Sequence, residues 1–134
     1  MTQEEKQILL RDLCARLPYG VKCRALYNKF TTTLVDVKVD PNIGDDLCII
    51  TVKLEKTGQN SPSLIEDIRP YLRPMSSMTE EEENKYNSLN AYEKGIFPHT
   101  EEAFDWLLAN HFDFRGLIEK SLALKAPENM YEKK

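Results

Sequence analysis

The sequence predicts an α+β fold: an N-terminal helix, a small antiparallel sheet that can curl into a partial barrel, and a C-terminal helical pair that covers one face of the sheet. Three observations support this prediction. Apolar residues recur at helical spacing near the N-terminus, three segments between residues 21 and 55 alternate or concentrate β-forming side chains, and helix-starting signals return after residue 78.

The composition fits a single domain. The chain has 134 residues, 41% of them hydrophobic, which is enough for one ordinary core. We divide it into a helix (1–20), a sheet with its closing segment (21–78), helices (79–127) and a tail (128–134). The net charge of -4 argues against broad affinity for nucleic acids or anionic membranes.

The sequence also favours a soluble cytoplasmic protein. Its first residues lack the basic flank and apolar run of a secretory signal, and no apolar run approaches the roughly 18 residues that span a bilayer. Cys14, Cys23 and Cys48 show no paired spacing, so we expect reduced, mostly buried thiols. We predict no metal site and no cofactor.

The first helix is predicted to begin after Thr2, whose side chain can cap it. Glu4 and Glu5 in its first turn complement the helix dipole, and Pro18 and Gly20 end it. Its apolar face is predicted to contain Leu10, Leu13, Cys14 and Leu17.

Three strands are predicted next. Period-two alternation favours strands at 21–28 and 34–39, and β-branched residues favour a third at 47–55. The turn formers of 40–46 predict a polar hairpin loop, whose glycine spacing does not match a calcium-binding EF-hand. Residues 57–63 are predicted to form a loop.

Residues 69–78, which we call the strap, are predicted to lie across the core. Pro70 and Pro74 each fix one φ angle and remove one backbone donor, so the strap suits neither a helix nor a central strand. We expect one helical turn at 64–68 and then the strap as a fourth strand at the edge of the sheet.

Helices return after the strap. Thr79 and Glu82 match a capping box that starts a polar, lightly attached helix. Thr100 is predicted to cap a stronger helix, and Asp113 a last one. The apolar faces of these two helices are predicted to be Ala103, Phe104, Leu107, Leu108 and His111, beside Trp106, and then Phe114, Leu117, Ile118 and Leu122.

Catalytic signals are weak. The chain has two histidines and no glycine-rich phosphate loop. His111, Asp113 and a serine, Ser76 or Ser77, could be combined into a triad, but nothing marks a nucleophile elbow. A packed histidine at a helix end is the favoured interpretation, so we predict no catalytic residues and no enzymatic activity.

Four segments resemble a known group of proteins. They are LCARLPYGV at 13–21, RPYLRPMSSMTEEE at 69–82, HFDFRGLIEK at 111–120 and APENMY at 126–131. Together they resemble a family of small uncharacterised proteins encoded by anaerobic gut bacteria and their phages or prophages. Phe114 and Ser121 stand where members of that family tend to have tyrosine and glycine. The resemblance implies a mobile-element, cytoplasmic setting and brings no activity or catalytic residue.

The leading functional prediction is a non-enzymatic protein-binding or adaptor module. Sheet edges accept partners, and aromatic, methionine and arginine side chains are enriched in interface cores. The predicted protein-binding residues are Tyr71, Arg73, Met75, Met78 and Arg115. The predicted partner is another protein or a second copy of the chain. One of the two arginines is expected to pair with an acidic group: Asp113, Glu119 or the glutamates 80–83.

The alternative prediction is a nucleic-acid-binding regulator. A basic strand face with interleaved aromatic rings can bind single strands through phosphate contacts and stacking. The residues that form this candidate face are Lys22, Arg24, Tyr27, Lys29 and Phe30. Solvated strand faces often have this composition, so the net acidity makes this the second choice.

Overall fold

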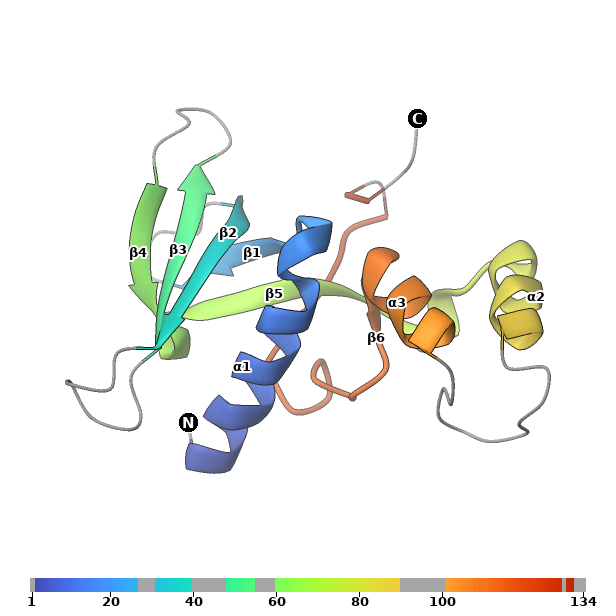
Figure 1. The fold of residues 1–134 in the computed structure, drawn as a ribbon, viewed down its shortest axis with the longest axis horizontal. Helices are drawn as coiled ribbons and strands as arrows, with labels where there is room; N and C mark the ends of the chain where they lie inside the picture. The colour runs from blue at the N-terminus through green and yellow to red at the C-terminus, as the bar shows by residue number, and fades with distance from the viewer. Residues whose placement is uncertain are drawn as a thin grey trace.

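The computed structural model describes residues 2–26, 31–39, 48–54, 60–89, 101–128 and 130–131. Within these ranges it confirms the α+β class, with an N-terminal helix, a mixed sheet and C-terminal helices (Figure 1). The helices are α1 (Gln3–Arg16), α2 (Glu80–Leu89) and α3 (Glu101–Ala109). None of these helices has the length and apolar character needed to cross a membrane.

The described strands are β1 (Lys22–Ala25), β2 (Thr31–Val39), β3 (Cys48–Leu54), β4 (Asn60–Leu64), β5 (Ile68–Pro74), β6 (Phe112–Asp113) and β7 (Leu124–Lys125). The three strands predicted before the strap are confirmed as β1, β2 and β3. The predicted hairpin loop 40–46 lies outside the described residues. The predicted loop 57–63 is wrong in part, because β4 begins at Asn60 and pairs with β3.

Helix α1 begins and ends as its sequence predicts. The Thr2 hydroxyl accepts a hydrogen bond from the Glu5 backbone at 3.1 Å, and the Glu5 carboxylate accepts one from the Thr2 backbone at 2.9 Å. These bonds lower the pKa of Glu5. A 3-10 turn at Leu17–Tyr19 follows α1, and Gly20 has a left-handed φ of 66°, which glycine adopts without steric cost.

The buried face of α1 differs from the prediction. Leu9, Leu13 and the charged pair Asp12 and Arg16 are buried. Cys14 is exposed, so the expectation that this thiol is buried is wrong. The spacing of the apolar residues is consistent with either rotation of α1 about its axis. The observed rotation turns two charged residues inward, which is possible because they form an ion pair with hydrogen bonds of its own.

The sheet is mixed rather than antiparallel. Its strand order is β4-β3-β2-β1-β5-β6, and β7 also pairs with β5. The four pairings among β1, β2, β3, β4 and β5 are antiparallel, whereas β6 and β7 each pair with β5 in parallel. The sheet does not close into a barrel. Pro62 lies in β4, an edge strand, where a missing donor is tolerated.

The strap forms a strand, but the prediction that this strand lies at the edge of the sheet is wrong, because β5 lies between β1 and β6. Its two prolines fit there because β5 changes partners along its length. Pro70 forms the last pair with β1, opposite Cys23, and Pro74 forms the last pair with β6, opposite Asp113. Each proline therefore stands where a ladder ends, and its missing donor interrupts no continuous pairing.

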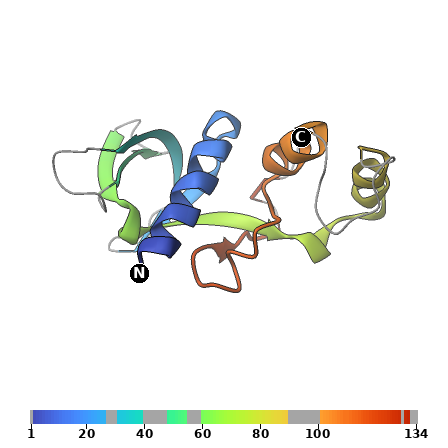
Figure 2. The same cartoon turned by 60° about the horizontal axis from the view of Figure 1, so that its bottom comes forward.

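The core lies between α1, the sheet and the segment 114–123. Its members are Leu9, Leu13, Val21, Cys23, Ala25, Leu34, Ile65, Ile68, Leu72, Leu117, Leu122 and Ala123. Outside this cluster, α3 buries Ala103, Leu107 and Leu108 and contacts β6, whereas α2 has no buried residue, so only α3 of the two C-terminal helices packs against the sheet. Figure 2 shows that α1, α3 and α2 follow one another along the length of β5.

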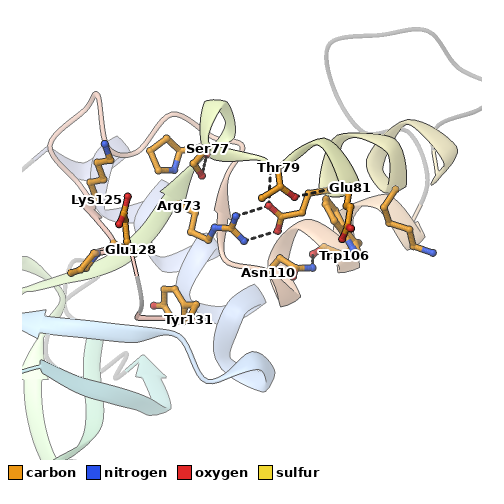
Figure 3. A pocket seen from close by; sticks show the side chains of 14 residues that line it. Arg73, Ser77, Thr79, Glu81, Trp106, Asn110, Lys125, Glu128 and Tyr131 are labelled. Carbon is orange, nitrogen blue, oxygen red and sulfur yellow. Dashed lines mark hydrogen bonds and ion pairs between the residues drawn. The ribbon is translucent and has the colours of Figure 1, made fainter. Parts of the chain in front are cut away.

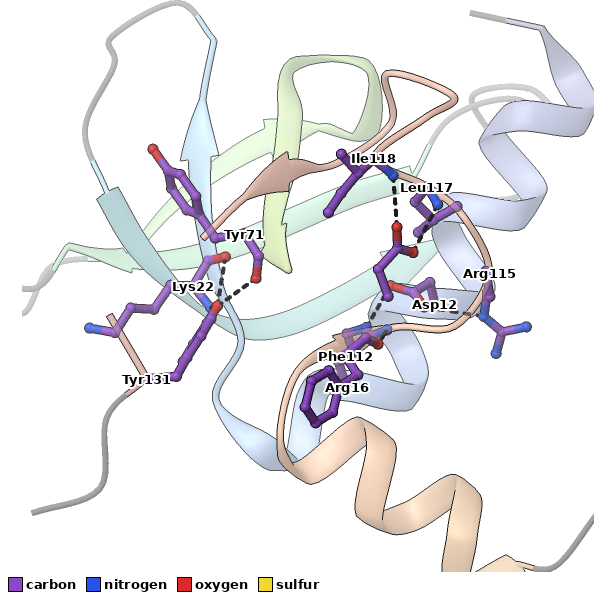
Figure 4. Close-up of polar contacts among 10 residues, drawn as sticks. Asp12, Arg16, Lys22, Tyr71, Phe112, Arg115, Leu117, Ile118 and Tyr131 are labelled. Carbon is purple, nitrogen blue, oxygen red and sulfur yellow. Dashed lines mark hydrogen bonds and ion pairs between the residues drawn. The ribbon is translucent and has the colours of Figure 1, made fainter. Parts of the chain in front are cut away.

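The last predicted helix does not form, since residues 114–123 make turns. Asp113 belongs to β6, and its carboxylate accepts hydrogen bonds from the backbones of Leu117 at 2.8 Å and Ile118 at 3.0 Å (Figure 4). Gly116 and Ser121 have φ angles of 73° and 61°. Left-handed residues interrupt an α-helix, so Asp113 organises a turn instead of a helix.

Candidate binding groove

Beyond the core, β5 continues into a polar end of the molecule. A 3-10 turn at Met75–Ser77 joins it to α2. The capping box predicted there is confirmed: the Thr79 hydroxyl accepts from the Glu82 backbone at 3.2 Å, and the Glu82 carboxylate accepts from the Thr79 backbone at 2.9 Å. Helix α2 has no buried residue, as the lightly attached helix of the prediction requires.

Arg73 on β5 forms a bidentate ion pair with Glu82 on α2. Its two terminal nitrogens donate to the two carboxylate oxygens at 2.8 and 2.7 Å, and its guanidinium lies 4.2 Å from the ring centre of Phe112. The bonds from Arg73 lower the pKa of Glu82. The prediction that Arg73 pairs with the glutamate run is confirmed.

This ion pair lines a groove between α2, α3 and the C-terminal segment (Figure 3). Its volume of about 910 Å³ lies near the upper end of ligand pockets, about 300–1,000 Å³. The lining residues are Arg73, Pro74, Ser77, Thr79, Glu81, Glu82, Lys85, Trp106, Asn110, Lys125, Ala126, Pro127, Glu128 and Tyr131. The groove therefore joins three segments that are far apart in the sequence, 73–85, 106–110 and 125–131.

Trp106 supplies an aromatic wall of the groove. Its ring stacks on Phe112, with ring centres 5.6 Å apart, and on Tyr86 of α2, with ring centres 6.2 Å apart. It is half-buried and is the only tryptophan of the chain. A large aromatic side chain fixed between two others offers a rigid contact surface that costs little conformational entropy on binding.

Tyr131 closes the groove on the side of the sheet. Its hydroxyl accepts from the Lys22 backbone at 2.8 Å and donates to the Tyr71 carbonyl at 2.8 Å (Figure 4), and its ring stacks on His111 at 3.7 Å. Burial raises the pKa of Tyr131. The hydroxyl thus bridges β1 and β5 directly after the last pair of their ladder, Cys23 with Pro70.

The charges around the groove are balanced. Its cationic residues are Arg73, Lys85 and Lys125, and its anionic residues are Glu81, Glu82 and Glu128. Mixed charge with aromatic side chains suits the varied surface of a polypeptide. It suits an anionic polymer less, because phosphate binding depends on an excess of cations.

The predicted protein-binding residues of the strap only partly meet at this groove. Arg73 lines it, whereas Tyr71, Met75 and Met78 do not. All four are partly buried. The strap is a paired strand, which turns its side chains alternately toward and away from the core.

Arg115, the fifth predicted contact, forms its ion pair with an acidic residue outside the predicted set of Asp113, Glu119 and the glutamates 80–83. Its Nε donates to the buried carboxylate of Asp12 on α1 at 3.1 Å, and its guanidinium lies 4.8 Å from the ring centre of Phe114. The carboxylate of Asp113 is occupied by two backbone donors. A partner about a hundred residues away in the chain left no signal in the local sequence.

The basic strand face is described only in part. Lys22 and Arg24 lie on β1, both half-buried, and Arg24 stands directly opposite Arg69 of β5. Arg69 donates to three backbone carbonyls, so much of its hydrogen-bonding capacity serves the fold. The other predicted nucleic-acid contacts, Tyr27, Lys29 and Phe30, lie outside the described residues.

The packed-histidine interpretation is confirmed: His111 lies two residues after the end of α3, is buried, and stacks on Tyr131. Of its candidate triad partners, Asp113 accepts a backbone hydrogen bond in a turn, and the Ser77 hydroxyl donates to the Pro74 carbonyl at 2.6 Å. Among the described residues, no group of acidic, histidine and cysteine side chains could hold a metal ion.

Comparison with known proteins adds no family to this description. No protein-family model matches the chain, and neither a curated protein nor a solved structure matches it significantly. The chemistry of the groove is therefore the basis for inferring a function.

Proposed function

We propose that the protein is a non-enzymatic binding module that takes a short polypeptide segment into this groove. The observation that supports the proposal is Trp106, held half-buried on the groove wall between Phe112 and Tyr86. Tryptophan and arginine recur as the residues that dominate binding energy at protein interfaces. Here Trp106 and Arg73 line the same space.

A polypeptide suits the groove better than a small apolar ligand does. Lys85, Lys125, Glu81 and Glu128 surround an aromatic wall, so an extended peptide can place an apolar side chain on Trp106 and polar groups at the charged positions. The binding energy is expected to concentrate at Trp106, with the surrounding charges setting specificity and association rate.

The sequence resemblance is the basis for the cellular setting that we propose. Four segments of the chain resemble proteins of gut anaerobes and their phages, which supports a cytoplasmic role in a mobile element. We therefore expect the partner to be a phage or host protein that presents an accessible peptide segment.

Trp106 allows a direct test, because its fluorescence reports on the groove alone. Peptides selected from a random display library on the immobilised protein would be titrated against it in solution. We expect saturable changes in Trp106 emission, and affinity for the selected peptides reduced about tenfold or more by Lys125→Glu, a charge reversal in the groove.

Lys120→Glu is the matched control, since Lys120 is exposed and does not line the groove. It is expected to bind the selected peptides like the wild type. Failure to enrich any peptide, or equal binding by Lys125→Glu and Lys120→Glu, would overturn the groove as the binding site.

Nucleic-acid binding is the second candidate, favoured by the juxtaposition of Arg24 and Arg69 across β1 and β5. Binding through this face would release counterions, so affinity for a single-stranded oligonucleotide should fall steeply with salt. Binding that is indifferent to salt, or absent at low salt, would exclude it.

A further inference from the structure

Within the proposed groove, the guanidinium of Arg73 is the group best suited to bind an anion, and it already binds the carboxylate of Glu82. Arg73 directs both terminal nitrogens at Glu82 of its own chain, and both side chains line the groove. The pair is accessible from the groove, with side-chain exposures of 24% and 20%. Glu82 therefore occupies the place that an acidic ligand would take.

We infer that Glu82 is an internal competitor, and that the groove binds peptides bearing a carboxylate that replaces Glu82 at Arg73. This inference rests on the proposed function and names the class of its ligand. The carboxylate can come from an aspartate or glutamate side chain or from a peptide C-terminus. The exchange breaks and forms hydrogen bonds and ion pairs only, so no covalent step is involved.

The geometry of Arg73 favours a carboxylate over a neutral group. A planar guanidinium presents paired donors that match two carboxylate oxygens, and such charged pairs are stronger than neutral hydrogen bonds. The guanidinium lies over the ring of Phe112, 4.2 Å from its centre, and this contact keeps it in place while a ligand carboxylate replaces Glu82. An amide offers one oxygen and no charge, so it competes poorly with Glu82.

Helix α2 can accommodate the exchange. It has no buried residue, so a small displacement that withdraws Glu82 exposes no core. Release of Glu82 also changes the charge that a ligand meets, because Arg73, Lys85 and Lys125 then outnumber the remaining acidic residues, Glu81 and Glu128. The groove thus becomes cationic when its internal carboxylate leaves.

A tethered competitor makes binding selective. Glu82 is always close to Arg73, so its effective concentration is high and a free carboxylate alone cannot displace it. A ligand must add contacts elsewhere in the groove, for instance on Trp106. Removal of the competitor should therefore strengthen the binding of acidic peptides.

The discriminating variant is Glu82→Gln. Glutamine can still accept the Thr79 backbone hydrogen bond that starts α2, but it lacks the charge that competes for Arg73. Glu83→Gln is the matched control, because Glu83 is an exposed neighbour in the same helical turn that does not line the groove. Circular dichroism would verify that both variants fold.

The probes are peptide pools with a fixed central glutamate or glutamine, each made with a free and an amidated C-terminus. Titration would follow Trp106 emission. We expect Glu82→Gln to bind the glutamate pool about tenfold more tightly than the wild type and Glu83→Gln do. Binding of the amidated glutamine pool should not change, and the free C-termini show whether a terminal carboxylate suffices.

The outcomes separate the two proposals. If peptide binding depends on Lys125 but Glu82→Gln does not increase the affinity for acidic pools, Glu82 is not a competitor, and the groove remains the binding site. An absence of binding to every pool by the wild type and both variants would overturn the competitor and the proposed function together.

Discussion

The two ends of the molecule are stabilised in different ways. At the end formed by β1, β2, β5 and α1, buried aliphatic side chains such as Leu13 and Ile68 form the core. At the other end, α3 buries Ala103 and Leu107, but within the described residues α2 is attached only by polar and aromatic contacts. These are the ion pair of Glu82 with Arg73 on β5 and the stacking of Tyr86 on Trp106 of α3.

This difference has a functional meaning. Apolar burial stabilises a structure in proportion to the area removed from water and tolerates little rearrangement. A partly exposed ion pair contributes less to global stability than a buried core does and can be exchanged for another. The α1 end therefore acts as the scaffold, and the α2 end carries the contacts that a ligand can replace.

The largest effect is expected from the buried charges of the α1 end. The side chains of Asp12 and Arg16 are fully buried, with 0% exposure each, and their ion pair joins Oδ2 and Nε at 2.7 Å. Asp12→Asn leaves Arg16 buried without its counter-charge, which should lower the free energy of unfolding by about 3–5 kcal/mol. Urea unfolding measures this change, and Asp105→Asn on the exposed side of α3 is the control.

A somewhat smaller effect is expected from the core. Leu13→Ala removes a fully buried side chain and should lower the free energy of unfolding by about 2–5 kcal/mol. Phe104→Ala, at a side chain that is 38% exposed on α3, should cost clearly less in the same thermal or urea experiment. Equal losses would contradict the division into scaffold and exchangeable end.

The contact of Tyr131, a groove residue, with β1 and β5 of the α1 end should show an intermediate effect. Tyr131→Phe removes the hydroxyl that bridges Lys22 and Tyr71, and should cost about 0.5–1.5 kcal/mol. Hydrogen exchange at the Lys22 amide should accelerate, while amides of α2 should not change. An unchanged exchange rate at the Lys22 amide would show that the Tyr131 hydroxyl is not needed to protect this contact between β1 and β5.

The smallest global effect is expected from pH acting on Glu82. Its pKa is lowered in the folded protein by the hydrogen bonds from Arg73, so the ion pair stabilises α2 above the ordinary glutamate pKa of about 4.3 and is lost as the pH falls through the lower folded value. NMR should show α2 amides losing protection over this acidic range. In Glu82→Gln, that pH dependence should be weaker, and its persistence would implicate other groups.

Local signals in the sequence predicted much of the fold. The caps at Thr2 and Thr79 depend on residues three positions apart and were identified correctly. The strands with alternating or β-branched patterns were also found. The β4 strand was missed because Pro62 suggests a loop, although proline is compatible with an edge strand.

The remainder depends on contacts between distant parts of the chain. Asp12 pairs with Arg115, and Tyr131 bridges β1 to β5, and neither contact has a local signature. The predicted site included Arg73 correctly but omitted Trp106 and Tyr131, because their approach to the groove follows from tertiary structure. The presence of a single tryptophan in the chain could have indicated Trp106 as a binding residue, because tryptophan is enriched at interface hot spots.

Native-state hydrogen exchange of the wild type tests the division most directly. We expect amides of α2 to exchange through local opening, at a free energy well below that of global unfolding, while amides of α1 and β5 exchange only with global unfolding. Exchange of α2, α1 and β5 at one common free energy would contradict this division, because α2 would then be part of the scaffold.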